Sequence, residues 1–252
     1  MYAPFTAAYD ASGSEGDPDG TLVVVGLAAT DDKWGKFEAS WQKVLDDFDV
    51  PYFHMKELNQ RHSGTGIYAK WKDDPDTPRL FLKALVKSIK RGMNKAFIYG
   101  TILQDYRSVN QIYKLREGVG SPYVLTAGSC YDLVNTWMRK NYPKHRILHA
   151  FEKGDCGQKG LERLAKRHKH QVIPIAKTDP VTGDRYVPFQ AADLVAGAYR
   201  DAAGKRGKVQ SMEEYGEVLN DLARMLPQRA LVYRLDNLIE MCERYPDKCA
   251  RR

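Results

Sequence analysis

The chain has 252 residues, 43% of them hydrophobic, which suits one large domain with a sizeable core. Its 39 Lys and Arg outnumber its 32 Asp and Glu and give a formal charge of +7, which favours polyanionic partners but is equally typical of a solvated basic surface. The longest apolar stretch, 22–29, is too short to span a bilayer, and no secretory pattern is visible, so we expect a soluble, cytoplasmic protein.

The first part of the chain predicts a β-hairpin followed by a helix. Residues 5–11 and 21–30 are apolar and rich in β-branched residues, and the segment between them is dense in turn formers. Thr30 has the character of an N-cap, and apolar residues then recur at helical spacing. Residues 51–58 predict a short strand or strand end, and 59–76 a surface loop of a length that is often functional.

The rest of the chain alternates predicted helices and strands. Helices are expected at 80–89, 122–142, 160–168 and 189–200, and strands at 95–103, 146–152 and 171–177. Residues 211–226 and 231–245 predict a helical C-terminal section. An opening hairpin followed by alternating elements indicates an α/β fold, with a mixed sheet covered by helices.

A single carboxylate interrupts the first apolar strand. Strand alternation places Asp10 on one face with Ala8, and Tyr9 on the other. Because burying an ionised carboxylate is costly unless it is paired or coordinates a cation, Asp10 needs a partner. The alternative is that Asp10 caps the turn that begins at Ser12.

A second acid interrupts an Ala-rich helix late in the chain. Gln190, Asp193 and Gly197 share one helical face, and their small neighbours permit close approach to a sheet. Asp193 is therefore expected to point into a cleft. The alternative is a buried Asp bonded to the local backbone or to Arg200.

Further candidates stand at predicted strand ends. His54 and Glu57 end the segment 51–58, although His54 could be a core histidine and Glu57 a helix-start acid. Glu152 ends a later strand, with Asp155 as a rival for the same role. Either of these two could be a plain loop acid.

Together these acids predict carboxylates at strand ends plus one on a late helix. Two carboxylates about 4 Å apart repel by roughly 4 kcal/mol at an effective dielectric of 20, so something must offset the repulsion. A hard divalent cation does so, and oxygen ligands favour Mg²⁺ or Mn²⁺ over zinc. Two such ions can stabilise both oxygens of an in-line phosphoryl displacement, which makes phosphodiester hydrolysis the predicted chemistry.

Three segments of the chain resemble a known family in their order and spacing. They are Tyr-Asp-Ala-Ser-Gly at 9–13, Phe-His-Met-Lys-Glu-Leu at 53–58 and Pro-Phe-Gln-Ala-Ala-Asp-Leu at 188–194. The family is called domain of unknown function 3800, and it is considered ribonuclease H-like and to contain nucleases. The resemblance covers roughly 5–203, and the segment 188–194 is its most specific part.

The resemblance implies a fold, and this chain departs from the family's opening motif at one position. The fold is a ribonuclease H-like mixed β-sheet flanked by helices over 1–203, with 204–252 as a helical extension packed on the same domain. The family's opening motif often has Glu between its Asp and Ser, where this chain has Ala11. Losing that acid would remove a metal contact or a supporting bond, and with it part of the activity.

The resemblance also implies which residues act. Asp10, Glu57 and Asp193 would form the catalytic and metal-binding site, with Glu152 supplying another carboxylate to Mg²⁺ or Mn²⁺. The residues expected to support them are Ser12, His54 and Gln190. We therefore expect a nuclease acting on DNA or RNA. The alternative, which Ala11 favours, is a catalytically weak ribonuclease H-like module that binds nucleic acid or, through its C-terminal helices, a protein partner.

Other features bear on partners and on competing chemistries. Basic clusters that could hold a phosphate backbone, or form solvated helix faces, lie at 139–140, 144–146, 166–170 and 204–208. Tyr68 and Trp71 could stack on bases, although such aromatics more often only pin a loop. The four cysteines lack Cys-x-x-Cys spacing, which argues for reduced thiols and against structural zinc, and Cys156 has no activating partner that the sequence assigns. The common hydrolase, nucleotide and zinc-protease motifs do not occur.

Overall fold

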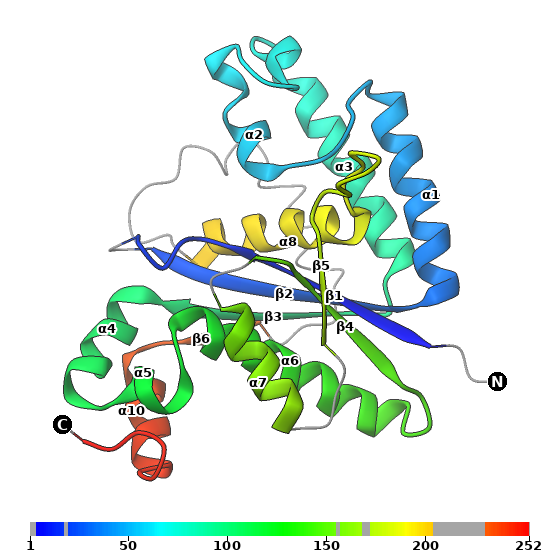
Figure 1. The fold of residues 1–252 in the computed structure, drawn as a ribbon. Coiled ribbons are helices and arrows are strands. Elements are labelled where there is room, and N and C mark those ends of the chain that lie inside the picture. Colours follow the sequence, from blue (N-terminus) through cyan, green and yellow to red (C-terminus); the bar gives the residue numbers. More distant parts are fainter. Residues whose placement is uncertain (1–3, 18–19, 155–156, 168–171, 204–229, 252) are drawn as a thin grey trace.

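A six-stranded mixed β-sheet runs between two layers of helices in the computed structural model, which describes residues 4–17, 20–154, 157–167, 172–203 and 230–251 (Figure 1). The strand order is β5-β4-β1-β2-β3-β6. The strands are β1 (Phe5–Ser12), β2 (Thr21–Thr30), β3 (Lys95–Ile102), β4 (Ile147–Glu152), β5 (Val172–Ile175) and β6 (Ala230–Tyr233).

The directions of the strands place three carboxyl ends together. β1 and β2 form the expected antiparallel hairpin, in register from Phe5 opposite Thr30 to Ser12 opposite Val23. β3 pairs antiparallel with β2, whereas β4 pairs parallel with β1, and β5 with β4. The residues that follow β1, β4 and β5 therefore lie at one edge of the sheet. The expected α/β architecture, a mixed sheet flanked by helices, is confirmed.

Helices cover both faces of the sheet. α1 (Asp31–Asp47), α3 (Asp76–Gly92) and α8 (Val187–Ala203) lie on one face, and α6 (Pro122–Asn141) and α7 (Gln158–Arg167) on the other (Figure 1). Strand alternation explains the two layers, because Ala8 and Val25 pack towards α8, while Tyr9 and Val24 pack towards α6. A third, smaller cluster joins α4 (Leu103–Ile112), α5 (Leu115–Val119) and α10 (Leu235–Arg244).

The α6 face of the sheet contains a buried polar chain that fixes β1. The Tyr9 hydroxyl and His149 Nδ1 are hydrogen-bonded at 2.8 Å, and His149 Nε2 lies 3.2 Å from Asn135 Oδ1. The Tyr9 ring covers Gly26 on β2, where an added Cβ would come within 2.6 Å of Tyr9 Cε1. Because Tyr9 is held from both sides, the next residue of β1, Asp10, has a fixed direction towards α8.

Two predicted elements are wrong. Residues 51–58 do not form a strand, since α2 (Met55–Asn59) begins there with His54 as its N-cap residue. Residues 231–245 do not form one helix, because β6 pairs parallel with β3 before α10 starts. α4 and α5 were not predicted. β6, with four residues, and α5, with five, contain too few repeats for their periodicity to identify them.

The loop 59–76 contains more regular structure than its polar sequence indicates. It contains two 3-10 turns, η1 (Arg61–Ser63) and η2 (Ala69–Trp71), and the Tyr68 and Trp71 rings are buried against Phe81 of α3. These aromatics pin the loop to the core. Of the two roles considered for them, the structure thus supports the more common one, pinning the loop, and not stacking on bases.

Several predicted features lie outside the described residues: the helix 211–226, the basic clusters at 168–170 and 204–208, and Asp155 and Cys156. In the described part of the chain, no helix combines the length and the apolar character that crossing a bilayer requires.

Candidate active site

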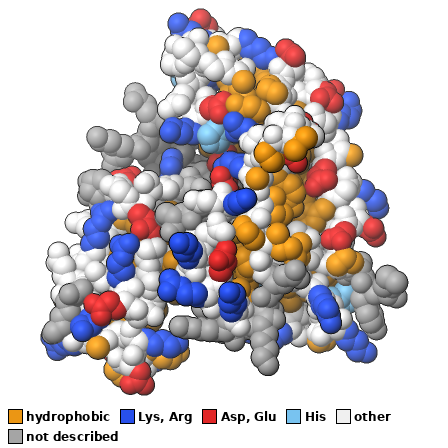
Figure 2. Space-filling model, viewed as in Figure 1, with side chains coloured by type: hydrophobic (Ala, Val, Ile, Leu, Met, Phe, Trp, Pro, Cys, Tyr) orange, Lys and Arg blue, Asp and Glu red, His pale blue; other side chains and the backbone are white. Residues whose placement is uncertain are grey.

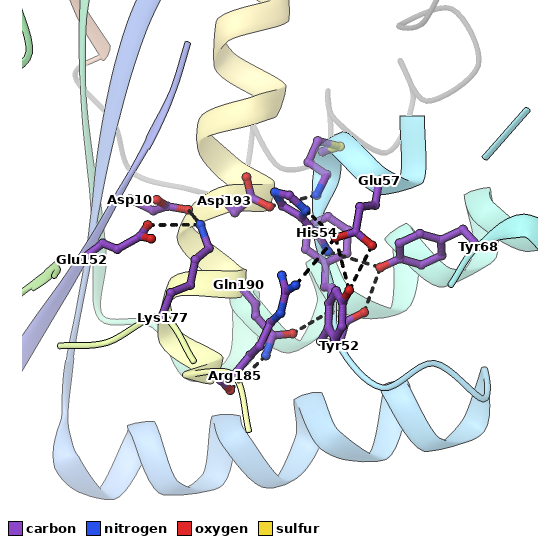
Figure 3. Close-up of polar contacts among 12 residues, drawn as sticks. Asp10, Tyr52, His54, Glu57, Tyr68, Glu152, Lys177, Arg185, Gln190 and Asp193 are labelled. Carbon is purple, nitrogen blue, oxygen red and sulfur yellow. Dashed lines mark hydrogen bonds and ion pairs between the residues drawn. The ribbon is translucent and has the colours of Figure 1, made fainter. Parts of the chain in front are cut away.

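Asp10 and Glu152 lie side by side at the carboxyl ends of neighbouring parallel strands. Tyr9 pairs with Phe151, and the next residue on each strand is the acid. Lys177, just beyond β5, reaches the same edge, with Nζ 3.2 Å from Glu152 Oε2 and 3.7 Å from Asp10 Oδ2. One ammonium group thus joins the two carboxylates (Figure 3).

The Asp10 carboxylate is buried and only partly satisfied. Its Oδ1 accepts a hydrogen bond of 2.9 Å from the Ala11 amide, whereas its Oδ2 accepts none from any residue that the structure describes. Burial raises the pKa of Asp10 well above its usual range; Lys177 opposes this, and Asp193 and Glu152 add to it. The hydrogen bond goes to the next strand residue, so Asp10 does not act as the cap of the following turn.

Asp193 approaches the same carboxylates from α8. Its Oδ2 accepts a hydrogen bond of 2.8 Å from the Met55 amide. Burial raises the pKa of Asp193, while that hydrogen bond and the charges of His54, Lys177 and Arg200 lower it. Asp193 is therefore bonded to a backbone amide, as a buried structural Asp would be. It also approaches Asp10, as a residue of the active site would. We call the four residues at this edge the acid-lysine group: Asp10, Glu152, Lys177 and Asp193.

Gln190, one turn earlier on α8, fastens the segment before α2. Its Oε1 accepts hydrogen bonds from the Phe53 amide at 2.7 Å and from Trp41 Nε1 at 3.2 Å. At Gly197 an added Cβ would lie 2.8 Å from Met55 Cγ, so the glycine leaves room for that side chain. The shared face of Gln190, Asp193 and Gly197 thus packs against residues 53–55.

Replacing Gln190 by Leu is expected to lower the free energy of unfolding by about 2–6 kcal/mol. Two buried donors would lose their acceptor, and each unsatisfied group costs about 1–3 kcal/mol. Thermal or urea unfolding measures the effect. Gln42→Leu, on the exposed side of α1, is the matched control, and equal stability of the two variants would contradict the fastening role.

A second polar cluster surrounds Glu57 at the start of α2. The Glu57 carboxylate accepts a hydrogen bond from the Tyr52 hydroxyl at 3.1 Å and lies 2.9 Å from His54 Nδ1 and 3.7 Å from an Arg185 nitrogen. The Arg185 guanidinium also lies 3.5 Å from the centroid of the Tyr52 ring. We call these residues the Glu57 group: Tyr52, His54, Glu57 and Arg185.

The two clusters are neighbours but are distinct. Figure 3 shows Glu57 separated from Asp10 and Glu152 by Asp193 and His54. Figure 2 shows acidic, basic and His side chains gathered where α2 meets the turn after β5. The structure therefore brings three of the expected acids together and places Glu57 beside them, in a different set of contacts.

The turn between β5 and α8 supplies a cation to each cluster, and neither cation was predicted. Thr178 and Arg185 form an antiparallel bridge, and the Tyr186 amide bonds to the Lys177 carbonyl at 2.9 Å. Burial lowers the pKa of Lys177, but the carboxylates of its group raise it, and the net direction is upward. Lys177 ends the predicted strand 171–177, so the strand-end argument used for acids would have found it.

The donor set suits a hard cation, with one condition. In the described part of the chain, no three His, Cys, Asp or Glu side chains stand close enough to hold one ion. Mg²⁺ takes only one or two carboxylates and completes its shell with waters and substrate phosphates. Asp10 and Glu152 fit that pattern, since Asp10 Oδ2 lacks a described hydrogen-bond donor. The condition is that Lys177 gives up part of its contact with them.

Ala11 faces away from this cluster. Alternation turns its side chain to the α6 face, where it packs against the core, whereas Ser12 returns to the Asp10 face. The Ala11 amide that bonds Asp10 is backbone and does not depend on the side chain. In this chain an acid at position 11 would point away from Asp10, so the expected loss of a metal contact there is not supported.

The described basic clusters at 139–140 and 144–146 lie far from the acids. Residue 146 leads into β4 and bonds through its carbonyl to the amide of Phe5, at the start of β1. Phe5 is five strand residues before Asp10, or about 17 Å at 3.3 Å per residue. These clusters are therefore at the opposite edge of the sheet and do not flank the site.

The chain has a distant structural likeness to ribonuclease H2 from Pyrococcus horikoshii OT3. The two are 12% identical, the match covers 88% of this chain and 98% of the other, and the TM-score is 0.40. No protein-family model matches the chain, and no curated protein sequence matches it. The likeness is too loose to transfer a residue or a reaction, so the function must be argued from the side chains.

Proposed function

We propose that this protein hydrolyses phosphodiester bonds of nucleic acid in a metal-dependent reaction at the acid-lysine group. The observation that carries the proposal is Asp10 Oδ2, a buried oxygen with no described hydrogen-bond donor, beside two further carboxylates. Three carboxylates face one ammonium, and such an excess of buried negative charge is costly unless a cation offsets it. The site must therefore take up a proton or a cation.

Each residue has a role that follows from its position. Asp10 and Glu152 would hold Mg²⁺ or Mn²⁺, and a bound ion supplies positive charge to the attacking and leaving oxygens. Lys177, whose side chain is 29% exposed, can reach a phosphate oxygen of the substrate. Glu57 would accept a hydrogen bond from His54 Nδ1, which leaves Nε2 as the ring nitrogen that can accept a hydrogen bond from the substrate or a water.

Membership of the domain of unknown function 3800 family is part of the proposal. Two of the segments that carry the resemblance, 53–58 and 188–194, contact each other through Gln190 and Asp193. The third, 9–13, contains Asp10. Segments that are distant in sequence thus meet at the acid-lysine group and the neighbouring Glu57 group. A cytoplasmic location stays a prediction.

Labelled single-stranded and double-stranded DNA and RNA, incubated with Mg²⁺, Mn²⁺ or EDTA, test the proposed activity. We expect cleavage that needs a divalent ion, and a loss of about 100-fold or more in Asp193→Asn. Asn can still accept the Met55 hydrogen bond, so the fold should survive. Asp236→Asn, at the exposed start of α10, is the control. Cleavage that persists in EDTA or in Asp193→Asn would refute the proposal.

A catalytically weak module that binds nucleic acid is the second candidate. The observation that favours it is Lys177, because its ammonium already bridges Asp10 and Glu152. A binding module would bind nucleic acid but cleave it with neither Mg²⁺ nor Mn²⁺, so the same assay separates the two candidates.

A further inference from the structure

A cavity of about 650 Å³ lies on the α6 and α7 side of the sheet, on the face opposite α8. Parts of α5, α6 and α7 and the residue Lys248 enclose it. Its charged lining consists of four cations and two acids: Arg116, Lys159, Arg163, Lys248, Glu117 and Asp132. Glu117 is also paired with Lys114 at 3.8 Å. The lining therefore carries an excess of positive charge, and Figure 2 shows Lys and Arg side chains gathered in this lower part of the molecule.

The cavity and the acid-lysine group share one edge of the sheet. Gly157, in the cavity wall, is five residues after Glu152, a length of chain that spans at most about 17 Å. Glu15, in the loop after β1, accepts a hydrogen bond of 2.9 Å from the Tyr123 amide at the start of α6. Glu15 and Gly157, which follow β1 and β4 in the chain, thus both lie at elements that line the cavity.

We propose that this cavity binds a nucleotide phosphate of the nucleic-acid strand that the acid-lysine group cleaves. The inference rests on the proposed function and adds a second contact point for the substrate. Because Glu152 and Gly157 are at most about 17 Å apart, a strand of several nucleotides is long enough to reach both places. The strand would pass around the sheet edge.

The size and chemistry of the cavity suit a nucleotide. Ligand pockets of about 300–1,000 Å³ hold molecules of this size. The cations can contact a phosphate, and Val119, Val124 and Leu125 offer an apolar wall to a sugar or base. The start of α6 is not the source of the attraction, because Glu15 and the Ser121 hydroxyl already accept hydrogen bonds from its first amides.

Fluorescence anisotropy with short labelled DNA and RNA strands, measured in EDTA, tests the cavity without cleavage. Arg116→Gln combined with Arg163→Gln removes two cavity cations whose side chains are exposed. We expect affinity to fall about tenfold and the salt dependence to weaken by about 1.4 in log-log slope for a single strand. The control, Arg139→Gln with Lys140→Gln, removes the same charge at the opposite edge and should change affinity less than about twofold.

Competition with 5′-AMP identifies the source of the phosphate. Competition in the wild type that disappears in the cavity variant means that a free nucleotide suffices, whereas its absence alongside intact strand binding means that a strand is required. Equal losses in both double variants, no loss in the cavity variant, or no strand binding by the wild type would overturn the proposal. Because binding is measured in EDTA, where no divalent ion supports cleavage, a failure of the cleavage assay leaves this result standing.

Discussion

Replacing Asp10 by Asn is expected to abolish divalent-dependent cleavage and, in EDTA, to raise the melting temperature. The wild-type carboxylate is buried with one oxygen lacking a described donor, and burial is the main reason that its pKa is raised. An acid whose pKa is higher in the folded than in the unfolded state costs stability once it ionises. The cost is absent below the unfolded pKa of about 3.9 and grows as the pH rises towards the folded pKa. Asn carries no such cost.

Thermal unfolding in EDTA at about pH 5 and about pH 8 measures this difference. Asp10→Asn should gain more over the wild type at the higher pH, and each kcal/mol corresponds to about 2–4 °C in a domain of this size. Mn²⁺ should stabilise the wild type and not the variant, because a ligand that binds the native state raises its stability. Asp236→Asn controls for net charge. A variant that melts below the wild type at about pH 8, or that keeps the full Mn²⁺ effect, would contradict the account.

The parts of the site that the sequence predicts are those fixed by local rules. Strand alternation places Asp10 on one face of β1, whereas its neighbour Glu152 is brought beside it by the parallel pairing of β4, a contact between distant segments. Helical periodicity alone puts Gln190, Asp193 and Gly197 on one face of α8. The hairpin and the long helices follow from the same rules, which need only neighbouring residues.

The parts that the sequence does not predict depend on contacts between distant segments. The segment 53–57 resembles a strand end, but its path is set by hydrogen bonds from the Phe53 and Met55 amides to side chains of α8. Glu57 therefore stands on α2 and not at a strand end. Likewise Trp71 is buried because α3 supplies Phe81. No pattern within these segments contains that information.

Replacing Lys177 by Gln is expected to destabilise the protein in EDTA and to enlarge the stabilisation by Mn²⁺. A Lys whose pKa is raised in the folded state contributes stability below its unfolded pKa, about 10.4, and loses it only as the pH rises through the folded value. The contribution is therefore complete at neutral pH. Breaking a fully buried ion pair costs about 3–5 kcal/mol, and the 29% exposure of Lys177 reduces this to about 2 kcal/mol.

A divalent ion and the Lys177 ammonium serve the same carboxylates, Asp10 and Glu152, so they should compete. Without the ammonium, Mn²⁺ should recover most of the lost stability and raise the melting temperature by more than in the wild type. Lys43→Gln, which breaks an exposed pair with Asp47, should cost little and leave the Mn²⁺ effect unchanged. A Lys177→Gln protein that Mn²⁺ does not rescue would mean that the ammonium is a fixed part of the cluster. The binding module would then be the better description of this site.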